Sequence, residues 1–122
     1  MKYLLDSVIV IDHLNGVEAA TEFLLIQSDH WAISVITRAE VLAGCRDDAE
    51  APVLALLSRF PTLPQTADIA DAAARLRRSE RLKLPDDIQA AVTLAHGISL
   101  VTRNTRDFQS GGLVPVVIPY EL

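Results

Sequence analysis

The chain has 122 residues, half of them apolar and only 5% aromatic, and sixteen acidic residues against eleven basic ones give a net charge of −5. This length fits a single domain, residues 1–122, with an aliphatic core, and the lone Cys45 excludes an internal disulfide and a cysteine-rich zinc site. The acidic balance argues against nucleic-acid binding by bulk electrostatics. With no secretory signal and no apolar run of roughly 18 residues, we expect a cytoplasmic protein without a membrane span.

Short apolar runs and helix caps alternate along the first half of the chain. Ser34 or Thr37 can cap the helix that follows the second strand, and Thr37 with Glu40 has the spacing of a capping box. Gly44 closes that helix. In chain order we predict a strand over 3–5, a short helix over 7–14, a helix over 17–26, a strand over 31–34 and helices over 35–43 and 47–59.

The second half has clearer boundaries. Two prolines restrict residues 60–64 to an edge strand at most, and Thr66 caps a helix that runs to about Arg81. Pro85 suits the edge of the next helix, which ends at Gly97 and leads into a buried strand over 98–102. The apolar face of that helix is predicted to contain Ile88, Ala91, Val92 and Ala95, and a last strand is predicted over 114–118.

Strands that alternate with helices predict a parallel sheet covered by helices on both faces. Ligands bind such sheets at the carboxyl ends of the strands, and four acids fall near those ends: Asp6, Glu40, Asp86 and Asp107. If they converge, two carboxylates about 4 Å apart repel by roughly 4 kcal/mol at an effective dielectric near 20. A proton or a hard divalent cation such as Mg²⁺ or Mn²⁺ would then be needed between them.

Each of these acids also has a purely structural interpretation. Asp6 can cap the helix that begins at Ser7, Glu40 can complete a capping box, Asp86 or Asp87 can answer the helix dipole, and Asp107 can be a turn residue. Five further acids have no strand-end position and are assigned to solvent or to caps: Asp12, Asp47, Asp48, Asp68 and Asp71.

Four motifs in order resemble a PIN domain, and in particular the VapC-type toxins of bacterial and archaeal toxin–antitoxin pairs. They are Leu4–Ser7, Ser34–Gly44, Asp86–Gly97 and Leu100–Phe108, and the resemblance covers essentially the whole chain. It implies a five-stranded parallel sheet flanked by helices, Mg²⁺- or Mn²⁺-dependent cleavage of RNA, a homodimer and a small antitoxin partner.

The resemblance also assigns residues. It implies metal-binding, catalytic acids at Asp6, Glu40, Asp86 and Asp107, with Ser7, Thr102 and Asn104 as polar residues supporting them. Val8 stands where the family has a small polar residue, and Gln89 where it often has an aliphatic one. Asp86 is preferred to Asp87 because it lies three residues before Gln89, and the number of ions, one or two, stays open.

Arginines near the acids are candidates for holding RNA phosphates: Arg38, Arg103 and Arg106. Receiver and haloacid-dehalogenase-type folds also place acids at strand ends, but the chain lacks a lysine late in the sheet and a second Asp at position 8. The remaining alternative is a catalytically weak or inactive PIN fold that acts as a protein-binding module.

Overall fold

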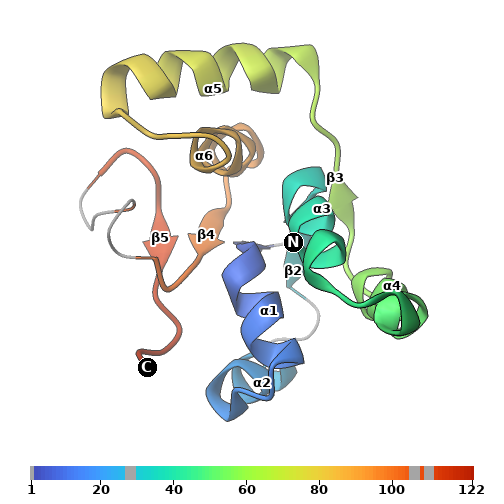
Figure 1. Cartoon of the computed structure of the whole chain (residues 1–122). Helices are drawn as coiled ribbons and strands as arrows, with labels where there is room; N and C mark the ends of the chain where they lie inside the picture. Colours follow the sequence, from blue (N-terminus) through green and yellow to red (C-terminus); the bar gives the residue numbers. More distant parts are fainter. Residues whose placement is uncertain (1, 27–29, 105–107, 109–111) are drawn as a thin grey trace.

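Five short strands form one parallel sheet in the order β3–β2–β1–β4–β5 (Figure 1). The structure is a computed structural model that describes residues 2–26, 30–104, 108 and 112–122. The strands are β1 (Tyr3–Leu5), β2 (Trp31–Ser34), β3 (Thr62–Leu63), β4 (Ser99–Val101) and β5 (Val116–Val117). They confirm the predicted five-stranded parallel sheet flanked by helices.

Helices occupy most of the chain between the strands. They are α1 (Ser7–Leu14), α2 (Glu18–Ile26), α3 (Val35–Gly44), the 3₁₀ helix η1 (Asp47–Ala49), α4 (Glu50–Leu57), α5 (Ala67–Glu80) and α6 (Asp86–His96). Within the described ranges these helices are too short or too polar to cross a bilayer.

Side chains on the central strands alternate between two apolar layers. Leu4 and Leu100 belong to one core cluster, which is completed by residues of α5 and α6. The next residues along the strands, Leu5 and Val101, belong to a second cluster with residues of α1, α2, α3 and α4. Successive residues of a strand point to opposite faces, so both faces of the sheet are buried. Figure 1 shows α5 and α6 together above the sheet, with α1, α2 and α4 below it.

Most predicted boundaries are confirmed within a residue or two, and three local details differ from the predictions. Ser34, one of the two predicted caps, is confirmed as the N-cap of α3 and accepts from the Thr37 amide, so Thr37 lies inside the helix and the alternative capping box of Thr37 and Glu40 is wrong. The predicted helix 47–59 is divided into η1 and α4. On α6, Ala95 is exposed and Gln89 is buried, because the covered face of this helix includes polar residues as well as apolar ones.

β1 is the topological switch point of the sheet, where strand addition changes from one side to the other. The chain adds β2 and β3 on one side of β1 and then crosses to place β4 and β5 on the other. The amide of Asp6 donates to the carbonyl of Val101 over 2.9 Å, so the ends of β1 and β4 are joined directly. This junction is the place where open α/β sheets bind ligands.

Candidate active site

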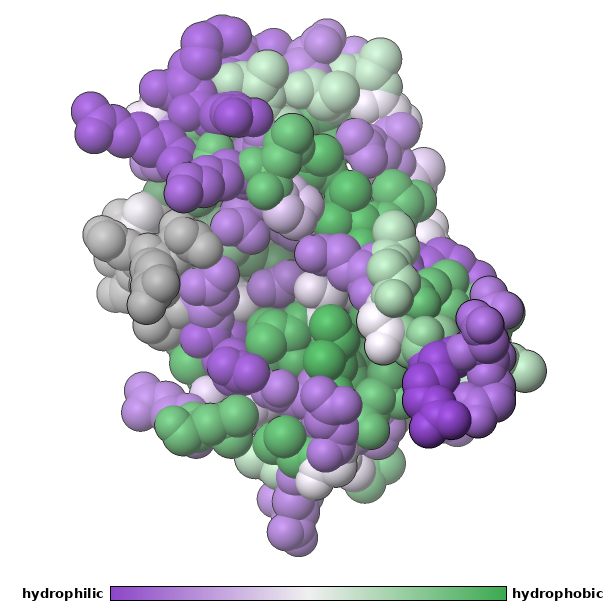
Figure 2. All heavy atoms as spheres, in the orientation of Figure 1, coloured by the Kyte–Doolittle hydropathy of each residue, from purple (hydrophilic) through white to green (hydrophobic). Residues whose placement is uncertain are grey.

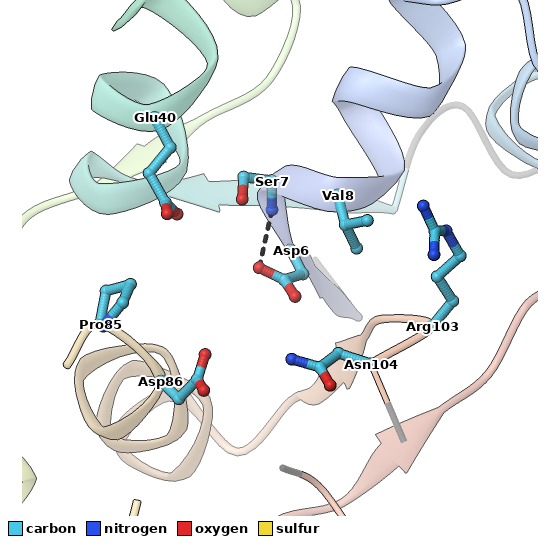
Figure 3. Close-up of a pocket in the computed structure, with 8 residues that line it drawn as sticks. All are labelled: Asp6, Ser7, Val8, Glu40, Pro85, Asp86, Arg103 and Asn104. Carbon is cyan, nitrogen blue, oxygen red and sulfur yellow. Dashed lines mark hydrogen bonds between the residues drawn. The ribbon is translucent and has the colours of Figure 1, made fainter. Parts of the chain in front are cut away.

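A cavity of about 470 Å³ opens at the carboxyl ends of β1 and β4. Figure 3 shows the carboxylates of Asp6, Glu40 and Asp86 pointing toward one space, with the side chain of Asn104 beside them. The residues that line the cavity are Asp6, Ser7, Val8, Glu40, Pro85, Asp86, Arg103 and Asn104. Acids separated by up to 80 positions in the sequence therefore share one pocket.

Asp6 is held at both of its carboxylate oxygens. It follows β1, and its Oδ1 accepts from the Ser7 amide at 2.8 Å, which makes it the N-cap of α1. Its Oδ2 accepts from Thr102 Oγ1 at 2.7 Å, and the residue is 8% exposed. Donors on both oxygens fix the orientation of the carboxylate, and the amino end of α1 favours its negative charge.

The two acids at the start of α6 have different surroundings. Asp86 lines the cavity, in the first turn of the helix after Pro85. Asp87 is 2% exposed, its Oδ1 accepts from the Ile88 amide at 2.8 Å, and it does not line the cavity. The geometry therefore places Asp86, the residue preferred from the sequence, at the pocket, and gives Asp87 a local hydrogen-bonding role.

Glu40 comes from the second turn of α3 and is exposed. Its backbone position depends on the start of that helix, where Ser34 is 1% exposed and caps the first turn. In Figure 3 the Glu40 carboxylate extends from α3 toward Asp86 across the open space.

The other predicted site residues divide into three groups. Ser7 and Asn104 line the cavity, and Thr102 links Asn104 to Asp6, because its Oγ1 accepts from the Asn104 amide at 3.0 Å and donates to Asp6 Oδ2 at 2.7 Å. Arg38 is half-buried and is not part of the described cavity lining. The predicted fourth acid, Asp107, and Arg106 lie outside the described residues.

Arg103 has a partner that sequence analysis missed. Its Nε and Nη2 donate to the two carboxylate oxygens of Asp12 at 2.6 and 3.0 Å, and Tyr120 Oη donates to the same carboxylate at 2.8 Å. Asp12 is 5% exposed, so its assignment to solvent or to a cap is wrong. The signal was present in the sequence: Asp12 lies on an apolar helix, and a buried carboxylate requires a charged partner.

This cluster shifts the acid–base equilibria of its members. The hydrogen bond from Arg103 holds the pKa of Asp12 below its ordinary value, against an opposing effect of burial. The Asp12 carboxylate raises the pKa of Arg103, and burial together with Asp12 raises the pKa of Tyr120 far above its usual range. All three groups therefore keep their ordinary charge states at neutral pH.

The pocket is rich in negative charge. Three carboxylates line it, and the guanidinium that also lines it is already paired with Asp12. Among the described residues, no three His, Cys, Asp or Glu side chains lie close enough together to enclose a metal ion. The donors are nevertheless hard oxygens, and Mg²⁺ takes only one or two carboxylates directly while it keeps several waters. An open acidic pocket of this size fits a hydrated divalent ion.

Comparison with known proteins identifies the family of this chain. A model of the PIN domain matches residues 3–111. The chain belongs to the PIN domain family.

Individual relatives cover nearly the same region. Ribonuclease VapC10 of Mycobacterium tuberculosis is 37% identical over 112 residues, covering 86% of this chain and 84% of that protein. Ribonuclease VapC19 of the same species is 34% identical over 113 residues, covering 86% and 90%. A toxin–antitoxin complex from Klebsiella pneumoniae contains a chain with 38% identity and a TM-score of 0.91, covering 99% of this chain and 100% of that one.

Proposed function

We propose that this chain is a divalent-metal-dependent endoribonuclease, the toxin of a type II toxin–antitoxin pair, acting in the cytoplasm. The observation that carries the proposal is the cavity lined by Asp6, Glu40 and Asp86 at the junction of β1 and β4. Relatives above 30% identity that are named ribonucleases support RNA as the substrate. The Klebsiella complex, at 38% identity, supports a small antitoxin as the partner.

The residues that would hold the ion, directly or through its bound waters, are the three pocket acids, with Asp107 as the predicted fourth. Their oxygen donors favour Mg²⁺ or Mn²⁺. A bound ion of this kind supplies a Lewis acid, activating water and neutralising charge on the phosphodiester under attack.

The protein's own groups orient these ligands and the substrate. Ser7 and Thr102 hold the Asp6 carboxylate through the hydrogen bonds to its two oxygens. Asn104 offers an amide side chain at the cavity wall. Arg38, Arg103 and Arg106 are proposed to contact RNA phosphates, with Arg103 oriented by its bidentate bond to Asp12.

The test is cleavage of a mixture of cellular RNAs, with new RNA ends mapped by sequencing. Wild-type protein should cut at a limited set of sites with Mg²⁺ or Mn²⁺ and not with chelator. Asp6→Asn should lose at least about 100-fold in rate, because a ligand that orients the ion is removed. Asp71→Asn, an exposed acid on α5, is the matched control and should cut normally.

Absence of cleavage by the wild-type protein with both ions would contradict the proposal. If the protein still bound a small partner under those conditions, the inactive binding module would be the correct alternative.

A further inference from the structure

Gln89 is a buried polar residue at the centre of the elements that carry the pocket acids. It is 1% exposed and lies one turn after Asp86 on α6. Residues three apart on a helix share a face, so the side chains of Asp86 and Gln89 leave α6 in similar directions. Gln89 does not line the cavity. Burying a primary amide costs free energy unless its oxygen and its nitrogen both have hydrogen-bond partners, so the residues packed around Gln89 must supply them.

All of its polar atoms are in contact with neighbouring elements. Its Oε1 accepts from Ser34 Oγ at 2.5 Å, and its Nε2 donates to Thr37 Oγ1 at 2.8 Å. The same nitrogen lies 3.5 Å from Asp6 Oδ1, the oxygen that also caps α1.

The two hydroxyls extend the network to the sheet and to α3. Thr37 Oγ1 donates to the carbonyl of Leu5, the last residue of β1, at 3.0 Å. Ser34 Oγ accepts from the Thr37 amide and so caps the helix that carries Glu40. Every buried side-chain nitrogen or oxygen in the described part of the chain has a hydrogen-bond partner, so this network is complete.

We propose that Gln89 is a positioning residue that sets the separation of the Asp6, Glu40 and Asp86 carboxylates for a divalent ion. The inference rests on the proposed function and deepens it. One amide joins α6, which carries Asp86, to the start of α3, which carries Glu40, and to Asp6 itself. Because the amide group is planar, its oxygen is directed toward Ser34 when its nitrogen is directed toward Thr37 and Asp6. An aliphatic side chain at this position would leave the hydroxyls of Ser34 and Thr37 without their present partners.

The experiment measures Mn²⁺ binding to the whole chain by calorimetry. Gln89→Met keeps the length of the side chain and removes its donors and acceptor. We expect Mn²⁺ affinity to fall by about 10- to 100-fold, the range found when groups that orient metal ligands are replaced. The Mn²⁺ concentration for half-maximal RNA cleavage should rise by the same factor, while the rate at saturating Mn²⁺ changes much less.

Thr93→Val is the matched control. Thr93 is also fully buried and lies one turn further along α6, but its hydroxyl donates at 2.7 Å to the carbonyl of Gln89 in its own helix, and among the described residues it has no bond to the pocket acids. The Mn²⁺ affinity of Thr93→Val should stay within about twofold of wild type, even if the unfolding temperature of this variant falls as much as that of Gln89→Met. Thr37→Val tests the same network from α3 if Gln89→Met does not fold, and it should weaken Mn²⁺ binding in the same direction.

Two failures are distinguishable. Wild-type protein that binds no Mn²⁺ overturns the proposed function and this inference with it. Wild-type protein that binds Mn²⁺ and loses it in Asp6→Asn, while Gln89→Met and Thr37→Val bind as tightly as Thr93→Val, overturns only the positioning role.

Discussion

At the scale of single residues, Asp6 combines a structural and a chemical role in one carboxylate. It caps α1 and also lines the acidic cavity, where Glu40 and Asp86 face it. Repulsion among the three acids opposes the stabilisation that the cap provides, so the chain holds this charge at some cost in free energy of folding. Asn and Asp are about equally good N-caps, which allows the two roles to be separated by substitution.

We predict that Asp6→Asn and Asp6→Ala both lose Mn²⁺ binding and RNA cleavage, but differ in stability. Asn keeps the cap and removes the repulsion, but its NH2 group cannot accept from Thr102 Oγ1, so the two effects oppose each other and the free energy of unfolding should stay close to that of wild type. Ala removes the cap and should cost about 1 kcal/mol. Urea unfolding of the two variants in chelator measures the difference. Equal stabilities would mean that the bond from the Ser7 amide contributes little.

A second residue-scale prediction separates the neighbouring acids of α6. Asp86→Asn should abolish cleavage and leave stability close to wild type, because Asp86 faces the cavity. Asp87→Asn should retain cleavage and alter stability instead, because its carboxylate is buried against the Ile88 amide. Steady-state cleavage rates and thermal unfolding of both variants provide the measurement. Full activity in Asp86→Asn would reverse the assignment.

At the scale of elements, the cluster of Asp12, Arg103 and Tyr120 joins three parts of the chain, and Arg103 connects it to the cavity. Asp12 comes from α1, Arg103 from the segment after β4, and Tyr120 from the C-terminal segment. Asn104, which lines the cavity, is the next residue after Arg103, so the position of this wall depends on the ion pair.

The ion pair predicts a specific dependence of stability on pH. The folded-state pKa of Asp12 is depressed, so its contribution is present above the unfolded pKa near 4 and is lost as pH falls through the folded value. Asp12→Asn should therefore cost about 1.5–3 kcal/mol at pH 7, and this difference from wild type should shrink below about pH 4. Denaturant unfolding at a series of pH values measures it. A constant difference down to pH 2 would exclude the ion pair as the cause.

Tyr120→Phe is the matched variant for the same cluster. It removes the hydroxyl that donates to Asp12 and keeps the salt bridge to Arg103, so its cost should be smaller and should persist into acid further than that of Asp12→Asn.

Elements with local signals could be predicted from the sequence, and contacts between distant elements could not. Gly97 adopts the left-handed conformation that ends α6, with φ of 63°, and Thr66 caps α5, as their residue types indicated. The Asp12–Arg103 pair spans 91 positions, and no local pattern connects its members. Gln89 was noticed as a departure from its family, but its partners Ser34 and Thr37 become neighbours only when α6 packs beside α3 and β1.

The same distinction applies to the site. The alternation of strands and helices indicated the edge where the acids gather, because the carboxyl ends of parallel strands share that edge. The spacing of the acids was too loose to identify them, and the resemblance to PIN domains was needed to select Asp6, Glu40 and Asp86. Of the two candidate caps, Ser34 begins α3, and Thr37 is instead a fully buried residue of that helix whose hydroxyl donates to the Leu5 carbonyl of β1, a contact that no local pattern indicates.

At the scale of the whole molecule, an acidic chain must hold an acidic polymer. The net charge is −5, and the arginine that lines the cavity is already paired. In Figure 2, hydrophilic side chains dominate the surface over α5, while polar and apolar residues mix on the lower part of this face. Exposed arginines lie on α5 at Arg75, Arg77 and Arg78, but the pocket itself is lined by three carboxylates, so local reversal of charge by a divalent ion is the expected route to RNA binding there.

We therefore predict that RNA binding, and not only cleavage, depends on the ion. Affinity for labelled single-stranded RNA should be weak in chelator and restored by Ca²⁺, which need not support cleavage. The affinity should fall only slowly with salt concentration, because few basic side chains are expected to contact phosphates. Each such contact on a single strand contributes a slope of roughly −0.7 to the logarithmic plot of affinity against salt. Fluorescence anisotropy measures both quantities. Equal affinity in chelator and in Ca²⁺ would mean that RNA binds at a surface other than the acidic pocket.

Exposed apolar residues on the early helices predict self-association. Leu25 and Ile26, at the end of α2, are 73% and 77% exposed, and Leu14 at the end of α1 is 41% exposed. Side chains of this kind in the free subunit favour an interface. We expect a homodimer by light scattering at micromolar concentration and a shift to monomer in Leu25→Glu. A wild-type monomer under the same conditions would contradict the prediction.

The strand order has a consequence for the time at which the protein acquires its site during synthesis. β1 lies at the middle of the sheet, but its partner β4 is made after β2, β3 and the helices α1 to α6 have been synthesised, and the Asp6 carboxylate has no Thr102 hydroxyl to bind until then. Asp86 and Asn104 are also late. When the first 80 residues of a nascent chain have emerged from the ribosome, two of the three pocket acids are therefore present, on an incomplete sheet. The cavity is assembled only when the segment through residue 104 emerges, so translation leaves a long interval before the finished pocket exists.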